Sequence, residues 1–339
     1  MKQERNILID VLKGFAILLV VLGHSVQYNM PGNFDNSLIF RIIYSYHMPL
    51  FMFLSGFVSF GTFDGSKTKL IKRFKSLIIP FWCWFIISYI FSWLIYNLKG
   101  GSEPDFLNSI LEVLKSPDHG LWFLWVLFLN ILVLFISLKI SSKYEEILLL
   151  VFFALINVLV PLTGFTMLGM ASLTKLLLFF SIGYIFNKHA SKLKKTISLA
   201  GFLSLIFYPV LVAFWSRSGI PTFAEYITLI QPLKTIIIWV FNQAVPLTGI
   251  LASYKLFDLI VNYEFVFKDS LISLGRISLE IYSTHFYFFS FTYLLVFIPL
   301  DYRISLTFLV TLTATLLIQW LLKKSNWASF LLYGKPFKQ

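Results

Sequence analysis

The sequence has 339 residues, of which 58% are hydrophobic and only 13% are charged. Soluble domains contain about 45–50% apolar and about 25% charged residues, so this composition excludes an ordinary soluble protein and indicates a polytopic membrane protein. The net charge of +12 does not indicate nucleic-acid binding, because the basic residues cluster in short connections between apolar runs.

A membrane-spanning helix needs about 20 predominantly apolar residues. We expect ten such segments: residues 7–28, 38–60, 77–98, 120–138, 147–163, 170–187, 197–215, 233–252, 277–298 and 304–322. One set of connections holds most lysines and arginines, and the opposite set is nearly free of them, which predicts cytoplasmic N- and C-termini. The expected fold is an all-α integral membrane protein with ten transmembrane helices, in one domain spanning 1–339 and no soluble domain.

The first segment carries three ionisable residues, Asp10, Lys13 and His24. Each costs about 2.5–3.5 kcal/mol inside a bilayer on insertion scales, which indicates a function. Lys13 and His24 are separated by close to three helical turns and share a face, with Asp10 beside Lys13. An imidazole can accept the proton of a hydroxyl nucleophile. We therefore predict catalytic roles for Asp10, Lys13 and His24, with Lys13 binding an anionic donor. The alternative for His24 is a structural histidine packed between helices.

The second segment, residues 38–60, contains His47, and Pro49 follows two residues later. His47 lies in the outer half of the span and could face His24 across a short hairpin; function and structural pairing are equally open for it. Pro49 is expected to kink the helix. Ser55 and Gly56 are small residues that let a neighbouring helix approach closely.

A basic segment follows the second span, and its candidate donor-binding residues are Lys72, Arg73 and Lys75. It is explained either by orientation of the chain and contact with anionic lipids, or by binding of donor phosphates. Arg73 suits a bidentate phosphate contact best.

Weaker candidates lie further along the chain. Trp122 stands close after His119 at the start of the fourth span, and Glu280 and His285 lie within the ninth.

The single cysteine, Cys83, offers neither an intramolecular disulfide nor a metal cluster, and we expect no metal cofactor. No phosphate-binding glycine loop, zinc-type spacing or Gly-x-Ser-x-Gly motif is present in the sequence. The first apolar run lacks a cleavage site, so no signal peptide is expected.

Taken together, these stretches resemble the acyltransferase 3 family of integral membrane acyltransferases. The matching pieces are Asp10–Gly14 leading to Gly23-His24, His47–Phe51 leading to Phe57, Lys72-Arg73 leading to Pro80, Leu121–Leu124, and Gly275–Leu279 leading to His285. The His-Met-Pro-Leu-Phe form is similar to family members that act as sugar O-acetylases. The family often has Arg-x-x-Arg after the second span; here Ser76 stands in place of the second arginine.

The resemblance implies an O-acetyltransferase in the cell membrane, multi-pass and of the bacterial cytoplasmic-membrane type. Acetyl-CoA would be the cytosolic donor, and the acceptor would be a hydroxyl of a cell-surface polysaccharide or a lipid-linked glycan. In the family, a basic residue followed after ten others by a histidine is needed for activity, and here that pair is Lys13 and His24. Expected partners are therefore acetyl-CoA, the glycan and membrane lipids, and no nucleic acid.

Three alternatives stay open. His24 can act as general base or as a transient acetyl carrier. Transfer of a succinyl group is also possible within the class. A transporter or flippase of a glycan or lipid, with buried His, Lys and Glu residues as a proton relay, is the alternative function, disfavoured because no inverted repeat is visible.

Overall fold

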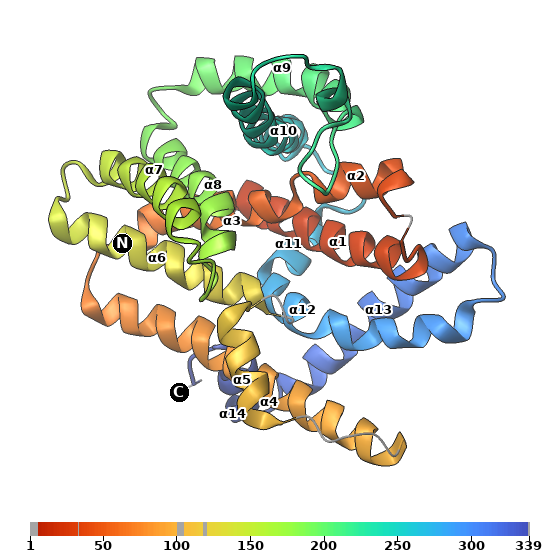
Figure 1. The fold of residues 1–339 in the computed structure, drawn as a ribbon. Helices are drawn as coiled ribbons and strands as arrows, with labels where there is room; N and C mark the ends of the chain where they lie inside the picture. Colours follow the sequence, from red (N-terminus) through yellow and green to blue (C-terminus); the bar gives the residue numbers. More distant parts are fainter. Residues whose placement is uncertain (1–5, 33, 100–104, 118–120, 338–339) are drawn as a thin grey trace. The chain divides into compact units, whose positions relative to one another are not determined.

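The computed structural model describes residues 6–32, 34–99, 105–117 and 121–337, and over these ranges the chain forms helices and turns without a strand (Figure 1). Nine helical segments of the described chain are long and apolar enough to cross a membrane: Ile7–Asn29, Leu38–Thr62, Lys67–Leu94, Trp122–Ile140, Glu145–Thr163, Met170–His189, Lys194–Ala213, Gln231–Ile260 and Leu300–Leu322. The prediction of an all-helical membrane protein is confirmed.

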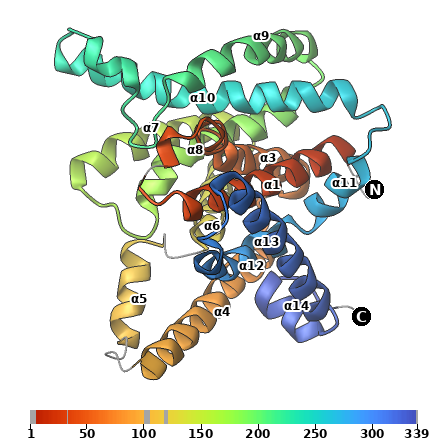
Figure 2. The same cartoon turned by 90° about the vertical axis from the view of Figure 1, so that its right-hand side faces the viewer.

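The chain divides into two compact units. The first unit comprises Met1–Leu54 and Phe186–Leu316. Its elements are α1 (Ile7–Asn29), η1 (Phe34–Asn36), α2 (Leu38–Tyr44), the start of α3 (His47–Thr62), α9 (Lys194–Ala213), η2 (Thr222–Tyr226), α10 (Gln231–Ile260), α11 (Lys268–Arg276), α12 (Ser278–Thr284), η3 (His285–Leu295) and most of α13 (Leu300–Leu322). Helices α9 and α10 pack side by side along their length (Figure 2).

The second unit comprises Ser55–Ile185 and Leu317–Gln339. It contains the rest of α3, α4 (Lys67–Lys99), α5 (Phe106–Lys115), α6 (Trp122–Ile140), α7 (Glu145–Thr163), most of α8 (Met170–His189) and α14 (Asn326–Tyr333). Within it, α4 packs against α6 and α14. Gly56 on α3 lies against the main chain of Phe180 on α8, where a Cβ would overlap the carbonyl of Phe180. The predicted close approach of a helix at Gly56 is confirmed.

The second predicted span is divided rather than kinked. Helix α2 ends at Tyr44 and α3 begins at His47, so the break falls before Pro49. Pro49 lies in the first turn of α3, where the main-chain N–H has no helical partner to lose. The expected kink at Pro49 is therefore wrong, and the break places Tyr44 and His47 next to each other at a helix junction.

The ninth predicted span, residues 277–298, is divided between α12 and the 3₁₀ helix η3. The side chains of Ser283, Thr284 and His285 hydrogen-bond to main-chain carbonyls of the preceding turn. The same kind of side-chain bond occurs within continuous helices, as for Ser137 in α6 and Ser181 in α8, so it accompanies the division without explaining it. Hydropathy detects the apolar run but not the change from α-helix to 3₁₀ helix at His285.

The basic segment after the second span is helical. Helix α4 begins at Lys67, ten residues before the predicted start of the third span, so Lys72, Arg73 and Lys75 lie on a helix and not in a loop. Hydropathy marks only the part of a helix that suits lipid, and the charged first turns of α4 fall outside that part.

Two glycines bring α1 and α11 into main-chain contact. A Cβ on Gly14 would overlap the carbonyl of Leu271, and one on Gly275 would overlap the carbonyl of Asp10. Only glycine allows two helix backbones to approach this closely. This crossing fixes the first half of α1, which carries Asp10 and Lys13.

Candidate functional site

His24 is held in place by two polar side chains. Its Nδ1 lies 3.1 Å from Oε1 of Gln27, one turn further along α1, and 2.9 Å from the hydroxyl oxygen of Tyr44 at the end of α2. The hydroxyl of Tyr44 also donates to Oε1 of Gln27 at 2.5 Å. The three polar atoms form a closed triangle around one edge of the imidazole.

This triangle determines which nitrogen of His24 carries a hydrogen. The amide oxygen of Gln27 only accepts hydrogen bonds, and the single hydroxyl proton of Tyr44 is given to it. Nδ1 of His24 must therefore be the donor in its own contacts. In a neutral imidazole the other nitrogen, Nε2, then keeps its lone pair and can accept a proton or attack a carbonyl.

His285 presents a second imidazole beside His24. The two ring centroids are 5.4 Å apart, and Phe286 packs against both rings. His285 is fully buried, and its Nδ1 lies 2.8 Å from the carbonyl oxygen of Tyr282, to which it donates. Its Nε2 has no hydrogen-bond partner among the residues that the structure describes. Both histidines thus hold Nδ1 on a fixed acceptor.

His47 also packs against Tyr44. Its ring centroid is 4.8 Å from that of Tyr44, and its Nδ1 lies 2.9 Å from the carbonyl oxygen of Ile43. Burial of His47 is nearly complete, at 4% exposure. The structure therefore brings three histidines from distant parts of the sequence around the end of α2, and we call His24, His47, His285, Tyr44 and Gln27 the histidine cluster.

The structure places Asp10 and Lys13 well away from this cluster, towards the start of α1. Asp10 lies 14 residues before His24, about 21 Å along the helix. Its buried carboxylate lies 3.5 Å from Nε of Arg276 on α11. Lys13 is half-buried one turn further along. A partner for Asp10 is thus supplied by α11, which the sequence pattern of α1 alone does not reveal.

The weaker candidates are dispersed. Glu280 is buried at 2% exposure on α12, one helical turn before the cluster member His285. Ser55 on α3 and Trp122 at the start of α6 are half-buried and belong to the second unit. His119 lies outside the described residues. Among the described residues no three His, Cys, Asp or Glu side chains are arranged to hold a metal ion.

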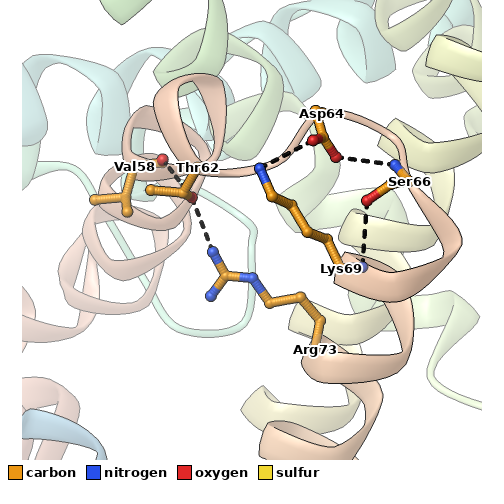
Figure 3. A network of polar contacts seen from close by, with 6 residues as sticks. All are labelled: Val58, Thr62, Asp64, Ser66, Lys69 and Arg73. Atoms are coloured by element: carbon orange, nitrogen blue, oxygen red, sulfur yellow. Dashed lines mark hydrogen bonds and ion pairs between the residues drawn. The ribbon is translucent and has the colours of Figure 1, made fainter. Parts of the chain in front are cut away.

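The basic segment has its own polar network (Figure 3). The Arg73 guanidinium donates to the hydroxyl of Thr62 at 2.9 Å, and Lys69 pairs with Asp64 at 3.1 Å. Hydrogen bonds from the main-chain N–H and side chain of Ser66, together with Lys69, lower the pKa of Asp64 to about 2, so it is charged at physiological pH. Lys72 and Lys75 are exposed. The basic segment therefore offers an anion two exposed ammonium groups, Lys72 and Lys75, and a guanidinium oriented by Thr62.

The model of the acyltransferase 3 family, described as an acyltransferase domain, matches residues 6–323. The chain belongs to this family. Membership makes the protein an acyltransferase, and its apolar helices make it a multi-pass membrane member of the acyltransferase 3 family.

Two curated relatives are both called nodulation protein NolL. The chain is 31% identical to that of Sinorhizobium fredii over 196 residues, covering 54% of this chain and 49% of the relative. It is 30% identical to that of Mesorhizobium japonicum over 152 residues, covering 43% of this chain and 38% of the relative. The chain thus spans about half the length, or less, of these relatives. No solved structure matches it.

Sequence reasoning missed Tyr44 and Gln27. Both are polar residues inside apolar segments, which is the same signal that pointed to His24. Gln27 also follows His24 by three residues, so the two share a helix face. Neither fact indicated that α2 would carry Tyr44 to the edge of the His24 ring.

Replacing Tyr44 by phenylalanine is expected to lower kcat of acyl transfer about 2- to 10-fold, the effect of losing one hydrogen bond of about 0.5–1.5 kcal/mol. Phenylalanine keeps the ring stacked on Phe40, and Gln27 still holds Nδ1 of His24. The KM for the acyl donor should not change. Steady-state kinetics of the purified variant test this, and a changed donor KM with normal kcat would contradict the role of Tyr44.

Proposed function

We propose that this protein is a membrane O-acetyltransferase that moves an acetyl group from cytosolic acetyl-CoA to a hydroxyl of a cell-surface polysaccharide or lipid-linked glycan. The proposal includes ten membrane spans with both termini in the cytoplasm, one acyltransferase domain over 1–339, and location in a bacterial cytoplasmic membrane. The family supports acyl transfer, and the positive-inside pattern supports the orientation. Succinyl-CoA is the alternative donor.

The observation that carries the proposal is the hydrogen-bonded edge of His24. Gln27 and Tyr44 occupy Nδ1, so the lone pair of Nε2 is left for chemistry. An imidazole held in this way is preorganised for proton transfer from an alcohol. Lys13 lies on the same helix, eleven residues or about 16 Å nearer the proposed cytoplasmic end.

Two chemical routes fit this arrangement. As general base, Nε2 takes the hydroxyl proton while the alcohol oxygen attacks the thioester carbonyl; the C–S bond breaks, and the departing CoA thiolate takes the proton from the imidazolium. As nucleophile, Nε2 attacks the thioester carbonyl, the C–S bond breaks and CoA leaves as the thiolate, which gives an acetyl-imidazolium; the alcohol oxygen then attacks the acetyl carbon, the C–N bond breaks, and the alcohol proton passes to solvent. Direct transfer requires a ternary complex, whereas the second route labels the enzyme without acceptor.

Release of CoA thiol tests the proposed function. Purified protein in nanodiscs should release CoA from acetyl-CoA faster when a glycan acceptor is added, and succinyl-CoA serves as the matched second donor. A transporter or flippase would release no CoA from either donor and would move glycan or lipid across sealed vesicles. Faster release of CoA from succinyl-CoA than from acetyl-CoA would show that succinyl-CoA is the donor. The protein would still be an acyltransferase.

Lys13→Ala is expected to weaken acetyl-CoA binding about 10- to 100-fold, because a charge-assisted contact to the donor contributes about 1.5–3 kcal/mol. Lys13→Arg should be partly active, since it keeps the charge. Donor binding is measured by isothermal titration, with thermal unfolding as the control for folding. Normal donor affinity in a folded Lys13→Ala variant would show that Lys13 does not bind the donor.

Neutralising Lys72, Arg73 and Lys75 together separates phosphate binding from orientation of the chain. If the basic segment binds the donor, the apparent affinity for acetyl-CoA falls and depends less on salt, while the remaining lysines keep the topology. If the segment only orients the chain, a correctly inserted triple variant keeps its affinity. Orientation is checked by the accessibility of introduced cysteines.

The contact between Arg73 and Thr62 supplies a matched control for the same segment. Thr62→Val removes the hydroxyl that Arg73 contacts but leaves every charge in place. We expect Arg73→Ala to produce the largest single loss of donor affinity, because only a guanidinium engages two phosphate oxygens at once. Equal losses in Thr62→Val and Arg73→Ala would assign Arg73 to structure instead.

A further inference from the structure

Arg217 lies beside the histidine cluster on an anchored turn between α9 and η2. Its turn is closed by the hydrogen bond from Gly219 N–H to the Ser216 carbonyl, 3.1 Å. The amide of Asn242 on α10 donates to the carbonyl of Gly219 at 2.7 Å, which ties the turn to that helix. Arg217 itself is exposed. Its main chain is thus fixed while its side chain is accessible.

The guanidinium of Arg217 packs over aromatic rings. Its central carbon lies 5.0 Å from the ring centroid of Phe34 and 5.6 Å from that of Tyr44. Phe40 connects these rings, stacking on Tyr44 with centroids 3.9 Å apart and packing on Phe34 at 4.7 Å. A guanidinium above aromatic rings uses its face, so its in-plane N–H donors stay available to an oxygen anion.

Two other arginines of the same unit use their donors internally. Arg41 donates to the carbonyl of Ala213 at 3.0 Å, and Arg303 donates to that of Asn29 at 3.0 Å. Arg217 has no hydrogen-bond or ion-pair acceptor among the described residues. Arg41 and Arg303 therefore support helix ends, whereas the donors of Arg217 have no acceptor in the described part of the chain.

Tyr44 links this guanidinium to His24. The face of its ring meets Arg217, and its hydroxyl contacts Nδ1 of His24. The guanidinium and the imidazole thus contact the same tyrosine side chain, one at its ring face and the other at its hydroxyl. A molecule contacting both presents an anionic group to Arg217 and a hydroxyl to His24.

We propose that Arg217 binds an anionic group of the glycan acceptor, a carboxylate or a phosphate, and thereby selects acidic or phosphate-linked acceptors. This inference rests on the proposed acyltransferase function, because it assigns the hydroxyl near His24 to the same acceptor. Guanidinium binds carboxylate and phosphate in bidentate geometry, and both groups remain charged at neutral pH. The carboxylate would belong to an acidic sugar and the phosphate to a lipid carrier.

Binding of defined probes tests the proposal without relying on turnover. Protein in nanodiscs of zwitterionic lipid is titrated with a uronic-acid oligosaccharide, with its neutral methyl ester, and with a polyprenyl phosphate. Arg217→Gln should raise the Kd of at least one anionic probe about 10- to 100-fold, the range for a charge-assisted contact. Arg217→Lys should lie between, because an ammonium lacks the planar fork. Lys234→Gln, which removes a charge from the first turn of α10, should match wild type.

The outcomes separate this inference from the proposed function. A loss confined to the uronic-acid probe indicates an acidic sugar, and a loss confined to the polyprenyl phosphate indicates a lipid carrier. If wild type binds neither anionic probe better than the neutral ester, or if Arg217→Gln binds both as wild type does, the Arg217 site is refuted. CoA release is measured on the same samples: arginine-dependent anion binding without CoA release would refute the acetyltransferase and keep the anion site.

Discussion

Replacing His24 by alanine is expected to reduce acetyl transfer at least about 100-fold, because a positioned general base contributes about 10²–10⁴-fold. No other imidazole in the histidine cluster has its Nδ1 held by the Gln27 and Tyr44 side chains, so a replacement group is not expected. The measurement is transfer of acetyl groups to glycan by purified protein. His189→Ala, which alters the last residue of α8, is the matched control and should keep wild-type activity.

The same variant also tests the choice of histidine. Thermal unfolding and membrane expression of His24→Ala should match wild type, because the change removes a half-buried side chain and leaves the α1–α11 crossing untouched. If His24→Ala retains more than a small part of wild-type activity, the catalytic assignment moves to His285, whose ring packs against the same Phe286 and whose Nε2 has no hydrogen-bond partner among the described residues.

Replacing Gly275 by valine is expected to destabilise the fold by about 3 kcal/mol, the upper end of the usual cost of overpacking. Any Cβ at this position overlaps the carbonyl of Asp10, and main-chain atoms cannot move aside without separating α11 from α1. The measurement is thermal unfolding in detergent, supported by the yield of monodisperse protein. Normal unfolding of Gly275→Val would show that α1 and α11 do not cross as closely as described.

Gly23→Ala provides the contrasting case. A Cβ on Gly23 meets the side chains of Tyr44 and Ile43, which can rotate, and not a main chain. Stability should therefore fall less than for Gly275→Val, while activity falls because Tyr44 is pushed from His24. A stability loss equal to that of Gly275→Val would contradict this distinction between the two glycines.

The sequence predicts elements well where a single helix carries the signal. The apolar run of α1 and the spacing of Lys13 and His24 are properties of one continuous helix, and the structure preserves both. Hydropathy did not detect the first turns of α4, because these turns are positively charged and hydropathy measures affinity for lipid, not helicity. The division of residues 277–298 escaped prediction because hydropathy reports apolarity and not the change from α-helix to 3₁₀ helix at His285.

The candidate site was likewise predicted only in part. His24 was found because an ionisable group in an apolar helix is costly. Its proximity to His285, separated from it by 260 positions, depends on how α1 packs against α12 and η3, and no periodicity within either segment encodes that packing. Two further contacts join segments that are distant in sequence: the ion pair between Asp10 and Arg276, and the contact of Arg217 with the ring of Tyr44. The sequence therefore predicts which residues are exceptional, and the tertiary structure determines their neighbours.

The most direct test of the account is a single-turnover experiment with acetyl-labelled acetyl-CoA and purified protein in nanodiscs. Wild-type protein is mixed with donor and glycan acceptor, quenched at intervals, and the label on the glycan is counted beside that of His24→Ala. We predict that label reaches the glycan in wild type and that transfer falls at least about 100-fold in the variant. Equal transfer by both proteins, or intact acetyl-CoA with wild type, would contradict it.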